Sequence, residues 1–341
     1  MTRSLRSRIS LALCLATTLA VGTVYAKPSE LVIFGDSLSD AGNNAALVDA
    51  GLFGFPVGSR TPTPISAPPI SDPVFIPTLP YSSNRYSNGP VWTEQFAASL
   101  GLSATNSLSP GGTNFAFGGA RIVGGAVPSL TNQLGSFLSL THGLAPSSAL
   151  YIVEGGGNDA RDVLETAAGG GDPAPLITAY AQNMGSLLSQ LEGAGARDIL
   201  LADIPDIGRI PAIATLGSFA SGLASDLAAQ MNSALFGELA HTPAGVNIHV
   251  LDLYGLLDKV TDDPGAFGLT NVTTACAADT QCIASPTGAF FWDGIHPTTE
   301  GAGLISNAAL AAVPEPTTVT LLVLGILSVL VLSQRRQRYL R

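Results

Sequence analysis

The chain has 341 residues, and 46% of them are hydrophobic. This length fits one large α/β domain, and the apolar content is ample for a core. The formal net charge is −10, but residues 27–313 alone carry 24 acidic and eight basic side chains, because the other basic residues lie at the two ends. So acidic a domain repels phosphate backbones, which argues against a nucleic-acid partner.

Residues 1–26 have the three parts of a secretory signal peptide. They carry three arginines near the start, then an apolar run over residues 9–21, and end in a small-residue motif at Ala26. A membrane anchor is the alternative interpretation, but the apolar run is short for one. We expect cleavage after Ala26 and export of the chain that follows.

Residues 30–34 form a short apolar run that predicts a buried strand, and Ser37 follows it in Phe34-Gly-Asp-Ser-Leu-Ser-Asp-Ala-Gly-Asn43. We expect this segment to open a helix, where backbone amides and the helix dipole favour an oxyanion. Helix capping is the alternative role for a serine at this place. The spacing differs from the Gly-x-Ser-x-Gly elbow of other α/β-hydrolases.

Residues 52–80 hold eight prolines among many serines and threonines. This composition predicts neither a helix nor a regular strand. The segment is a long insertion after the first strand. A lid over the site and a surface loop without fixed structure fit the composition equally well.

Two glycine-rich motifs, at residues 111–119 and 155–159, are candidates for the binding of a developing negative charge. Glycines let backbone amides approach a ligand closely, and Asn158 adds a side-chain amide. An acyl-transfer enzyme needs such donors for its oxyanion. Neither motif has the lysine or the spacing of a phosphate-binding or dinucleotide-binding loop, and a tight turn is the alternative reading of each.

Three further apolar runs predict strands at residues 149–154, 197–202 and 246–252, with helical patterns between them at 174–194 and 217–240. Strands that alternate with helices predict a parallel sheet covered on both faces. Ligands bind beyond the carboxyl ends of such strands, so the residues that follow the strands are the candidates for chemistry.

Cys276 and Cys282 are the two cysteines outside the predicted signal peptide. In an oxidising compartment their short spacing predicts a local disulfide. A zinc site needs more ligands, and no histidine lies near them in sequence. We therefore expect no metal.

His296 is one of four histidines, and it alone has an aspartate three residues earlier in a loop, in Asp293-Gly-Ile-His296. A histidine base needs a partner that fixes its tautomer and stabilises the imidazolium. The motif predicts His296 as a general base oriented by Asp293. The other three histidines, at 142, 241 and 249, are interpreted as solvated or structural.

Residues 317–334 carry no charge and are about long enough for a transmembrane helix. Four arginines follow, which favours a cytoplasmic end. Together with Pro314-Glu-Pro316, residues 313–341 resemble the PEP-CTERM sorting signal of Gram-negative bacteria, which implies processing by an exosortase, a membrane protease. A permanent tail anchor is the alternative. Both place residues 27–312 outside the cytoplasm, at the cell surface or outer envelope or secreted.

The motifs of residues 30–300 resemble, in order, the sequence blocks of the GDSL, or SGNH, hydrolases. The matching segments are Gly35-Asp-Ser-Leu38, Gly112-Thr-Asn114, Gly156-Gly-Asn-Asp159 and Asp293-Gly-Ile-His296. The resemblance implies one hydrolase domain at residues 27–312 with a flavodoxin-like, three-layer α/β/α sandwich around a parallel five-stranded sheet.

The resemblance also implies a role for each matched residue. Ser37 would be the nucleophile and the first oxyanion amide, and His296 and Asp293 would complete the triad. Gly112 and Asn158 would supply the other two oxyanion donors.

The sequence therefore predicts a secreted serine esterase or lipase that cleaves carboxylic esters, of lipids or acylated glycans, through an acyl-enzyme on Ser37. No metal or cofactor is required. A carbohydrate O-deacetylase or a lipid acyltransferase is one alternative. A non-enzymatic surface or adhesion protein on a hydrolase scaffold is the other.

Overall fold

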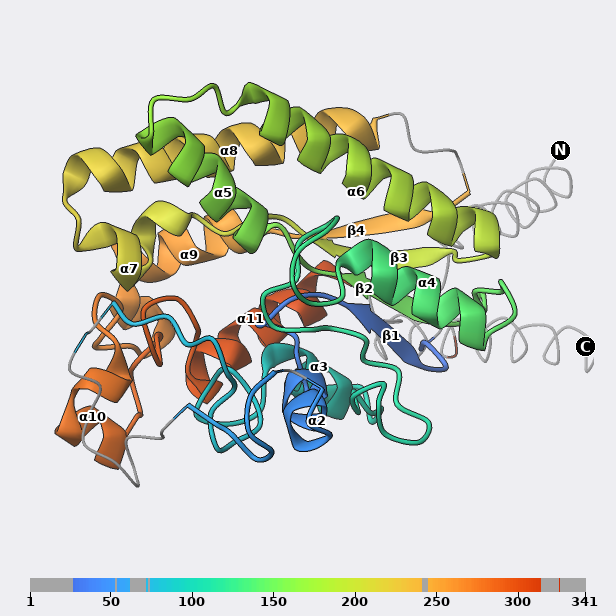
Figure 1. Ribbon diagram of the computed structural model, residues 1–341, viewed down its shortest axis with the longest axis horizontal. Helices are drawn as coiled ribbons and strands as arrows, with labels where there is room; N and C mark the ends of the chain where they lie inside the picture. Colours follow the sequence, from blue (N-terminus) through green and yellow to red (C-terminus); the bar gives the residue numbers. More distant parts are fainter. Residues whose placement is uncertain are drawn as a thin grey trace, which may run out of the picture. The chain divides into compact units, whose positions relative to one another are not determined.

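The four predicted strands form one parallel sheet in the computed structural model of the chain, which describes residues 27–52, 54–61, 72, 74–240, 245–313 and 325 (Figure 1). The strands follow each other across the sheet in chain order, with each pair parallel. They are β1 (Leu31–Phe34), β2 (Leu150–Val153), β3 (Asp198–Ala202) and β4 (Asn247–Leu251). Every residue of β1 and β2 is buried, which explains their unbroken apolar sequences.

Helices cover both faces of this sheet and confirm the three-layer architecture. Figure 1 shows α5, α6 and α8 on one side and α2, α3 and α11 on the other. The helices are α2 (Asn43–Asp49), α3 (Trp92–Ser99), α4 (Leu130–Leu140), α5 (Gly157–Ala168), α6 (Ala174–Ala194), α7 (Pro211–Ala214), α8 (Ser218–Leu239), α9 (Leu253–Asp262), α10 (Thr280–Ala284) and α11 (Thr299–Ala312), with 3₁₀ turns at Ile207–Arg209, Pro264–Phe267 and Cys276–Ala278. Helices α6 and α8 confirm the two helical patterns read from the sequence and pack against each other.

The expected fifth strand is absent from the described residues, which contain four strands. Residues 113–117 run parallel to the free edge of β1 instead. Ile33 N–H donates to Thr113 O at 3.0 Å, and Phe115 N–H donates to Ile33 O at 2.7 Å. Only one bridge forms, between Ile33 and Asn114. The Asn114 side chain bonds to backbone groups of Ser39 and Ala116, so this segment braces a loop and does not extend the sheet regularly.

The proline-rich insertion contains no helix or strand in its described residues, as its composition predicts. Thr61 N–H donates to Pro80 O at 2.9 Å, and Thr61 also forms a bridge with Tyr81. Residues 53, 62–71 and 73 of the insertion lie outside the described part of the chain.

The two predicted targeting segments, residues 1–26 and the transmembrane helix at 317–334, lie outside the described residues apart from Gly325. Among the residues that are described, none of the helices has the length and hydrophobicity that a membrane crossing requires. Residues 28–313 form one compact unit, which contains the sheet and the helices that cover it.

Asp203, at the carboxyl end of β3, couples the stability of the fold to pH. Its carboxylate accepts hydrogen bonds from the N–H groups of Leu253 and Tyr254, at 2.6 and 3.0 Å, where α9 begins. Burial raises the pKa of Asp203 to about 7. Between the ordinary aspartate pKa and this value, the folded state keeps a proton that the unfolded state has lost, so the free energy of unfolding falls as pH rises through that window.

We expect Asp203→Asn to remove this part of the pH dependence. From pH 4 to pH 7 the wild type should lose on the order of 3 kcal/mol more stability than the variant, measured by urea unfolding. Asp226→Asn, which changes an exposed aspartate on α8, is the matched control and should keep the wild-type slope. Equal slopes for Asp203→Asn and wild type would contradict the assignment.

Candidate active site

Ser37, His296 and Asp293 lie in hydrogen-bond contact, although the serine is more than 250 residues from the other two in sequence. Ser37 Oγ is 2.8 Å from His296 Nε2. The other ring nitrogen, Nδ1, is 2.8 Å from Asp293 Oδ2. With the proton on Nδ1, the ring donates to Asp293 and leaves Nε2 free to accept the Ser37 proton. The three predicted residues are thus brought together with the geometry of a nucleophile, a base and an orienting acid.

The Asp293–His296 turn is set by the aspartate itself. Its Oδ1 accepts from the N–H groups of Ile295 and His296, at 2.9 and 2.8 Å. Such a turn is a local property of aspartate in a short loop, so the four-residue motif fixes the acid and base relative to each other. Gly294 donates to Phe75 O at 2.9 Å, and a Cβ there would lie 2.5 Å from Val74 O. The proline-rich insertion therefore packs directly on the turn.

Tyr81, which follows that insertion, contacts the side chain of Asp293. Its hydroxyl donates to Asp293 Oδ2 at 3.0 Å, and its ring is fully buried. The ring meets Trp292 edge-on, with 6.0 Å between centroids. Both rings belong to a small core that includes Cys276, which the structure joins to Cys282 in a disulfide. Sequence reasoning missed Tyr81, because no spacing links it to Asp293.

Ser37 lies in a turn and not at the start of a helix, which corrects the sequence expectation. Helix α2 begins only at Asn43, after Gly42. The turn is stabilised by Asp36, whose Oδ1 accepts from Leu38 N–H at 3.0 Å. Consequently Ser37 caps no helix, and its own N–H has no acceptor among the described residues. The helix that begins near the site is α5, which starts one residue before Asn158.

Two buried carboxyl groups, Asp36 and Glu154, lie beneath this turn. Glu154 Oε2 accepts from Ser39 Oγ at 2.9 Å and is 3.4 Å from Asp36 N. Burial raises the pKa of Asp36 to about 6. Burial together with the Asp36 charge raises the pKa of Glu154 well above the ordinary value. Raised pKa values favour the protonated carboxyl groups, which limits the charge buried beside Ser37.

Asp40 holds the glycine-rich segment 111–119 beside the nucleophile turn. Its carboxylate accepts from the N–H groups of Gly42, Asn43 and Gly118, at 2.8, 2.7 and 3.0 Å. Burial raises the pKa of Asp40 to about 6. Asp40 stands in the Ser37 motif, but the motif alone does not reveal that it binds Gly118.

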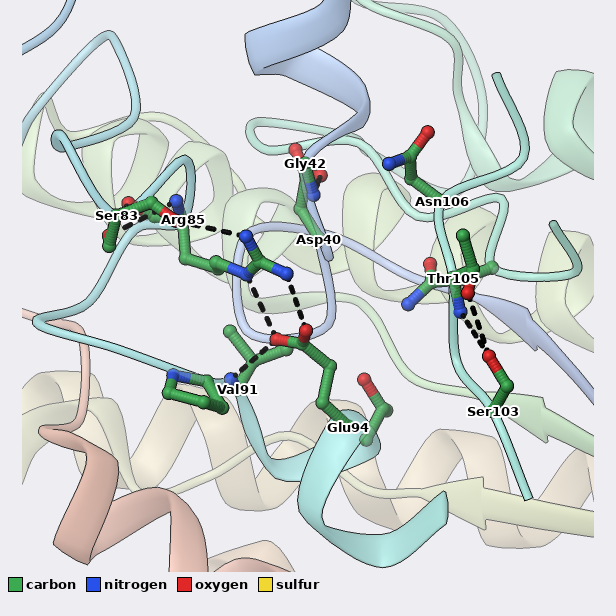
Figure 2. Close-up of polar contacts among 12 residues, drawn as sticks. Asp40, Gly42, Ser83, Arg85, Val91, Glu94, Ser103, Thr105 and Asn106 are labelled. Carbon is green, nitrogen blue, oxygen red and sulfur yellow. Dashed lines mark hydrogen bonds and ion pairs between the residues drawn. The ribbon is translucent and has the colours of Figure 1, made fainter. Parts of the chain in front are cut away.

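Arg85 and Glu94 anchor the segment that carries Tyr86. Figure 2 shows the Arg85 guanidinium and the Val91 N–H directed at the Glu94 carboxylate, with Asp40 nearby. Arg85 Nε and Val91 N each lie 3.0 Å from Glu94 Oε2. The Tyr86 ring then lies over His296, with 5.3 Å between centroids, and a Cβ at Gly118 would clash with that ring.

Gly112 is not brought to the site, which corrects the expected oxyanion hole. Its N–H donates to Ser109 O at 3.0 Å, and it does not line the cavity at Ser37. Gly118 and Gly119, at the end of the same motif, do line that cavity. The Gly118 N–H is taken by Asp40, whereas that of Gly119 has no acceptor among the described residues. The motif thus includes residues that reach the cavity, but its sequence does not show which amide faces it.

Asn158 lies where the sequence predicts, in the wall of the cavity that contains Ser37 and His296. Its side-chain amide donates to Ala120 O at 3.0 Å and lies 3.4 Å from Asp36 Oδ2. The cavity has a volume of about 390 Å³, and Ile76–Thr78 of the insertion form part of its wall. In the described part of the chain, no cluster of three or more His, Cys, Asp or Glu side chains could hold a metal ion.

Several known proteins are similar to this chain over most of its length. Esterase EstA of Pseudomonas aeruginosa is 29% identical in an alignment that covers 91% of this chain and 51% of that protein. GDSL esterase/lipase At5g22810 of Arabidopsis thaliana is 24% identical, with 83% and 88% covered. The chain spans about half the length of the first curated relatives that it matches.

A crystal structure of a member of the lipolytic protein G-D-S-L family from Veillonella parvula has 14% identity and a TM-score of 0.40, with 83% of this chain and 96% of that chain covered. The sequence model of GDSL-like lipase/acylhydrolases matches residues 31–309. Since this match takes in most of the chain, the protein belongs to the GDSL-like lipase/acylhydrolase family.

Proposed function

We propose that this protein is an exported serine hydrolase that cleaves carboxylic esters through an acyl-enzyme on Ser37. The observation that carries the proposal is the continuous contact from Ser37 Oγ to His296 and on to Asp293, with 2.8 Å at each step. Family membership and relatives named as esterases support it.

His296 begins the reaction by accepting the Ser37 proton at Nε2 while Oγ attacks the ester carbonyl carbon. The imidazolium that forms is stabilised by Asp293, which is itself held by Tyr81 and two backbone amides. Because all three side chains are nearly inaccessible to solvent, the interaction between imidazolium and carboxylate is weakly screened.

The carbonyl oxygen becomes an oxyanion, which we assign to the N–H groups of Ser37 and Gly119 and to the Asn158 side-chain amide. Gly119 replaces Gly112 in this role. Both backbone N–H groups lack an acceptor among the described residues, so neither must break a hydrogen bond to bind the oxyanion. Each donor in such a hole typically contributes about 100-fold or more in rate.

His296 next donates its proton to the leaving alcohol, and the Ser37 ester bond remains as the acyl-enzyme. Water then repeats the cycle: His296 removes a water proton, the hydroxide attacks the acyl carbon, and Ser37 leaves with the proton. None of these steps requires a metal or cofactor.

A carbohydrate O-deacetylase is the second candidate, and the walls of the cavity favour it over a lipid acyltransferase. Two arginines and two carboxylates contribute to the wall: Arg121, Arg161, Asp162 and Glu165. Such a surface suits a polyhydroxylated alcohol better than an acyl-glycerol. A purely adhesive role is less consistent with an assembled triad, and labelling of Ser37 by a fluorophosphonate probe would exclude it.

The export signals remain predictions from sequence. We propose that residues 1–26 direct export and that residues 313–341 tether the domain to the membrane until an exosortase-type protease processes the tail. The compact unit ends at Val313, directly before Pro314-Glu-Pro316, which supports this boundary.

Ser37→Ala tests the proposed function most directly. The full-length wild type should hydrolyse p-nitrophenyl acetate and butyrate, and the variant should lose at least about 1,000-fold in kcat because the acyl-enzyme cannot form. Circular dichroism should show an unchanged fold. Near wild-type turnover by a folded variant would overturn the assignment of Ser37.

Tyr81→Phe tests whether Asp293 needs the hydrogen bond from the Tyr81 hydroxyl. Loss of a buried hydrogen bond to a carboxylate should lower the free energy of unfolding by about 2 kcal/mol and kcat by about tenfold. Tyr180→Phe is the control, because the Tyr180 hydroxyl is buried without a hydrogen-bond partner in the described residues. The control should keep wild-type kcat. A kcat for Tyr81→Phe equal to that of Tyr180→Phe would show that the Asp293 contact is dispensable.

Deletion of residues 314–341 tests the domain boundary. The shortened protein should move from the membrane to the soluble fraction and retain wild-type turnover of p-nitrophenyl acetate, because the site is built within residues 28–313. Unfolding of the shortened protein would place structural contacts in the tail and contradict the boundary.

A further inference from the structure

Positive charge is scarce in this domain, yet part of it lies in the catalytic cavity. Residues 27–313 carry eight basic side chains against 24 acidic ones. Two of the eight, Arg121 and Arg161, line the cavity that contains Ser37 and His296. The two arginines differ in what they already bind.

Arg121 is neutralised by a carboxylate in the same wall. Its Nε and Nη2 lie 2.5 and 2.7 Å from the two oxygens of Asp162. Such a two-bond pair leaves little capacity for a further anion.

Among the arginines of the described residues, Arg161 alone has a guanidinium that bonds neither a carboxylate nor a carbonyl. Three of the others, besides Arg121, form ion pairs, and Arg197 donates to two backbone carbonyls. Arg161 is half-buried in the cavity wall, where a guanidinium retains donors in a fixed planar arrangement. The cavity wall thus contains a guanidinium that no carboxylate of the described residues bonds.

Arg161 lies on the same helix as Asn158, one of the proposed oxyanion donors. Asn158 and Arg161 are three residues apart on α5, so they share one face of the helix and are separated by about 5 Å along its axis. A substrate whose oxyanion bonds to Asn158 and whose alcohol part runs along α5 therefore passes Arg161. Glu165 follows one turn later at the exposed end of the same face.

A second cavity adjoins the first, although neither Ser37 nor His296 lines it. Its volume is about 40 Å³, and its wall is apolar, including Leu38, Leu256, Phe291 and Ile295. Leu38 is adjacent to the nucleophile, and Ile295 lines both cavities. So small an apolar space has room for a few atoms, which fits a short acyl group such as acetyl. With the acyl group in this space, the larger, polar cavity that contains Ser37 and His296 is left for the alcohol.

We propose that Arg161 is a specificity-determining residue that binds a carboxylate on the alcohol part of the ester. The preferred substrate class is then a short-chain ester of a sugar acid, such as an O-acetylated uronic acid. This inference rests on the proposed ester hydrolysis and names the substrate of the same site.

The test compares two sugars that differ only in the charged group: methyl glucuronide and methyl glucoside, each acetylated at the same hydroxyl. Acetate release by the full-length chain should show a kcat/KM at least about tenfold higher for the glucuronide, as expected for a hydrogen bond to a charged group. Arg161→Gln should lower this ratio to about one, and Arg161→Lys should retain part of it.

Two further variants sharpen the test. Glu165→Gln should increase the ratio, because it removes a negative charge from the same wall. Lys259→Gln removes an exposed positive charge on α9, outside both cavities, and should keep the wild-type ratio. A ratio near one in the wild type, or an unchanged ratio in Arg161→Gln, would overturn the proposal. If Arg161→Gln does not fold, the wild-type ratio alone decides.

Binding separates this proposal from the proposed hydrolysis. In the Ser37→Ala protein, calorimetry should give a Kd for the acetylated glucuronide about tenfold below that for the glucoside. Tighter binding of the glucuronide, combined with no turnover of p-nitrophenyl acetate or of either sugar by the wild type, would refute the proposed hydrolysis. Arg161 would then remain as an anion-binding residue. Turnover of p-nitrophenyl acetate with equal binding of the two sugars would refute the role of Arg161 alone.

Discussion

The site depends on the rule that a buried carboxylate must be surrounded by donors. Asp293, the acid of the proposed triad, is fully inaccessible to solvent. Removing it from water is costly unless hydrogen bonds replace the lost hydration. Four donors do so: the Tyr81 hydroxyl, the His296 ring and the N–H groups of Ile295 and His296. Satisfying one carboxylate therefore joins the turn that carries the base to the end of the proline-rich insertion.

The nucleophile turn obeys the same rule with different residues. Asp40 accepts backbone amides from its own turn and from Gly118, which ties the first strand's loop to the segment along the edge of β1. Asp36 and Glu154, whose pKa values burial raises, tie that turn to the end of β2. Three buried acids thus set the position of Ser37 relative to two other segments, at a cost in stability that grows as pH rises.

The sequence predicted what depends on local patterns. Apolar runs placed all four strands, and the Asp-x-x-His turn could be predicted because the aspartate bonds to amides within two and three residues of itself. Tyr81 could not be predicted, since only the folded chain brings it to Asp293 across more than 200 residues. Gly112 was a wrong choice for a related reason: neighbouring glycines look alike in sequence, and Asp40 decides which amides remain free near Ser37.

The proline-rich insertion connects stability with access to the site. Its last described residues bond to Gly294 and line the cavity, while Tyr81 bonds to the acid. A segment so placed cannot move far without disturbing the turn that holds His296. These contacts favour a fixed wall of the cavity, and not a freely opening lid, for residues 74–81. The α5 side of the same cavity is charged, because Arg161 and Glu165 line it. The cavity thus combines a wall fixed by the insertion with a charged wall from α5.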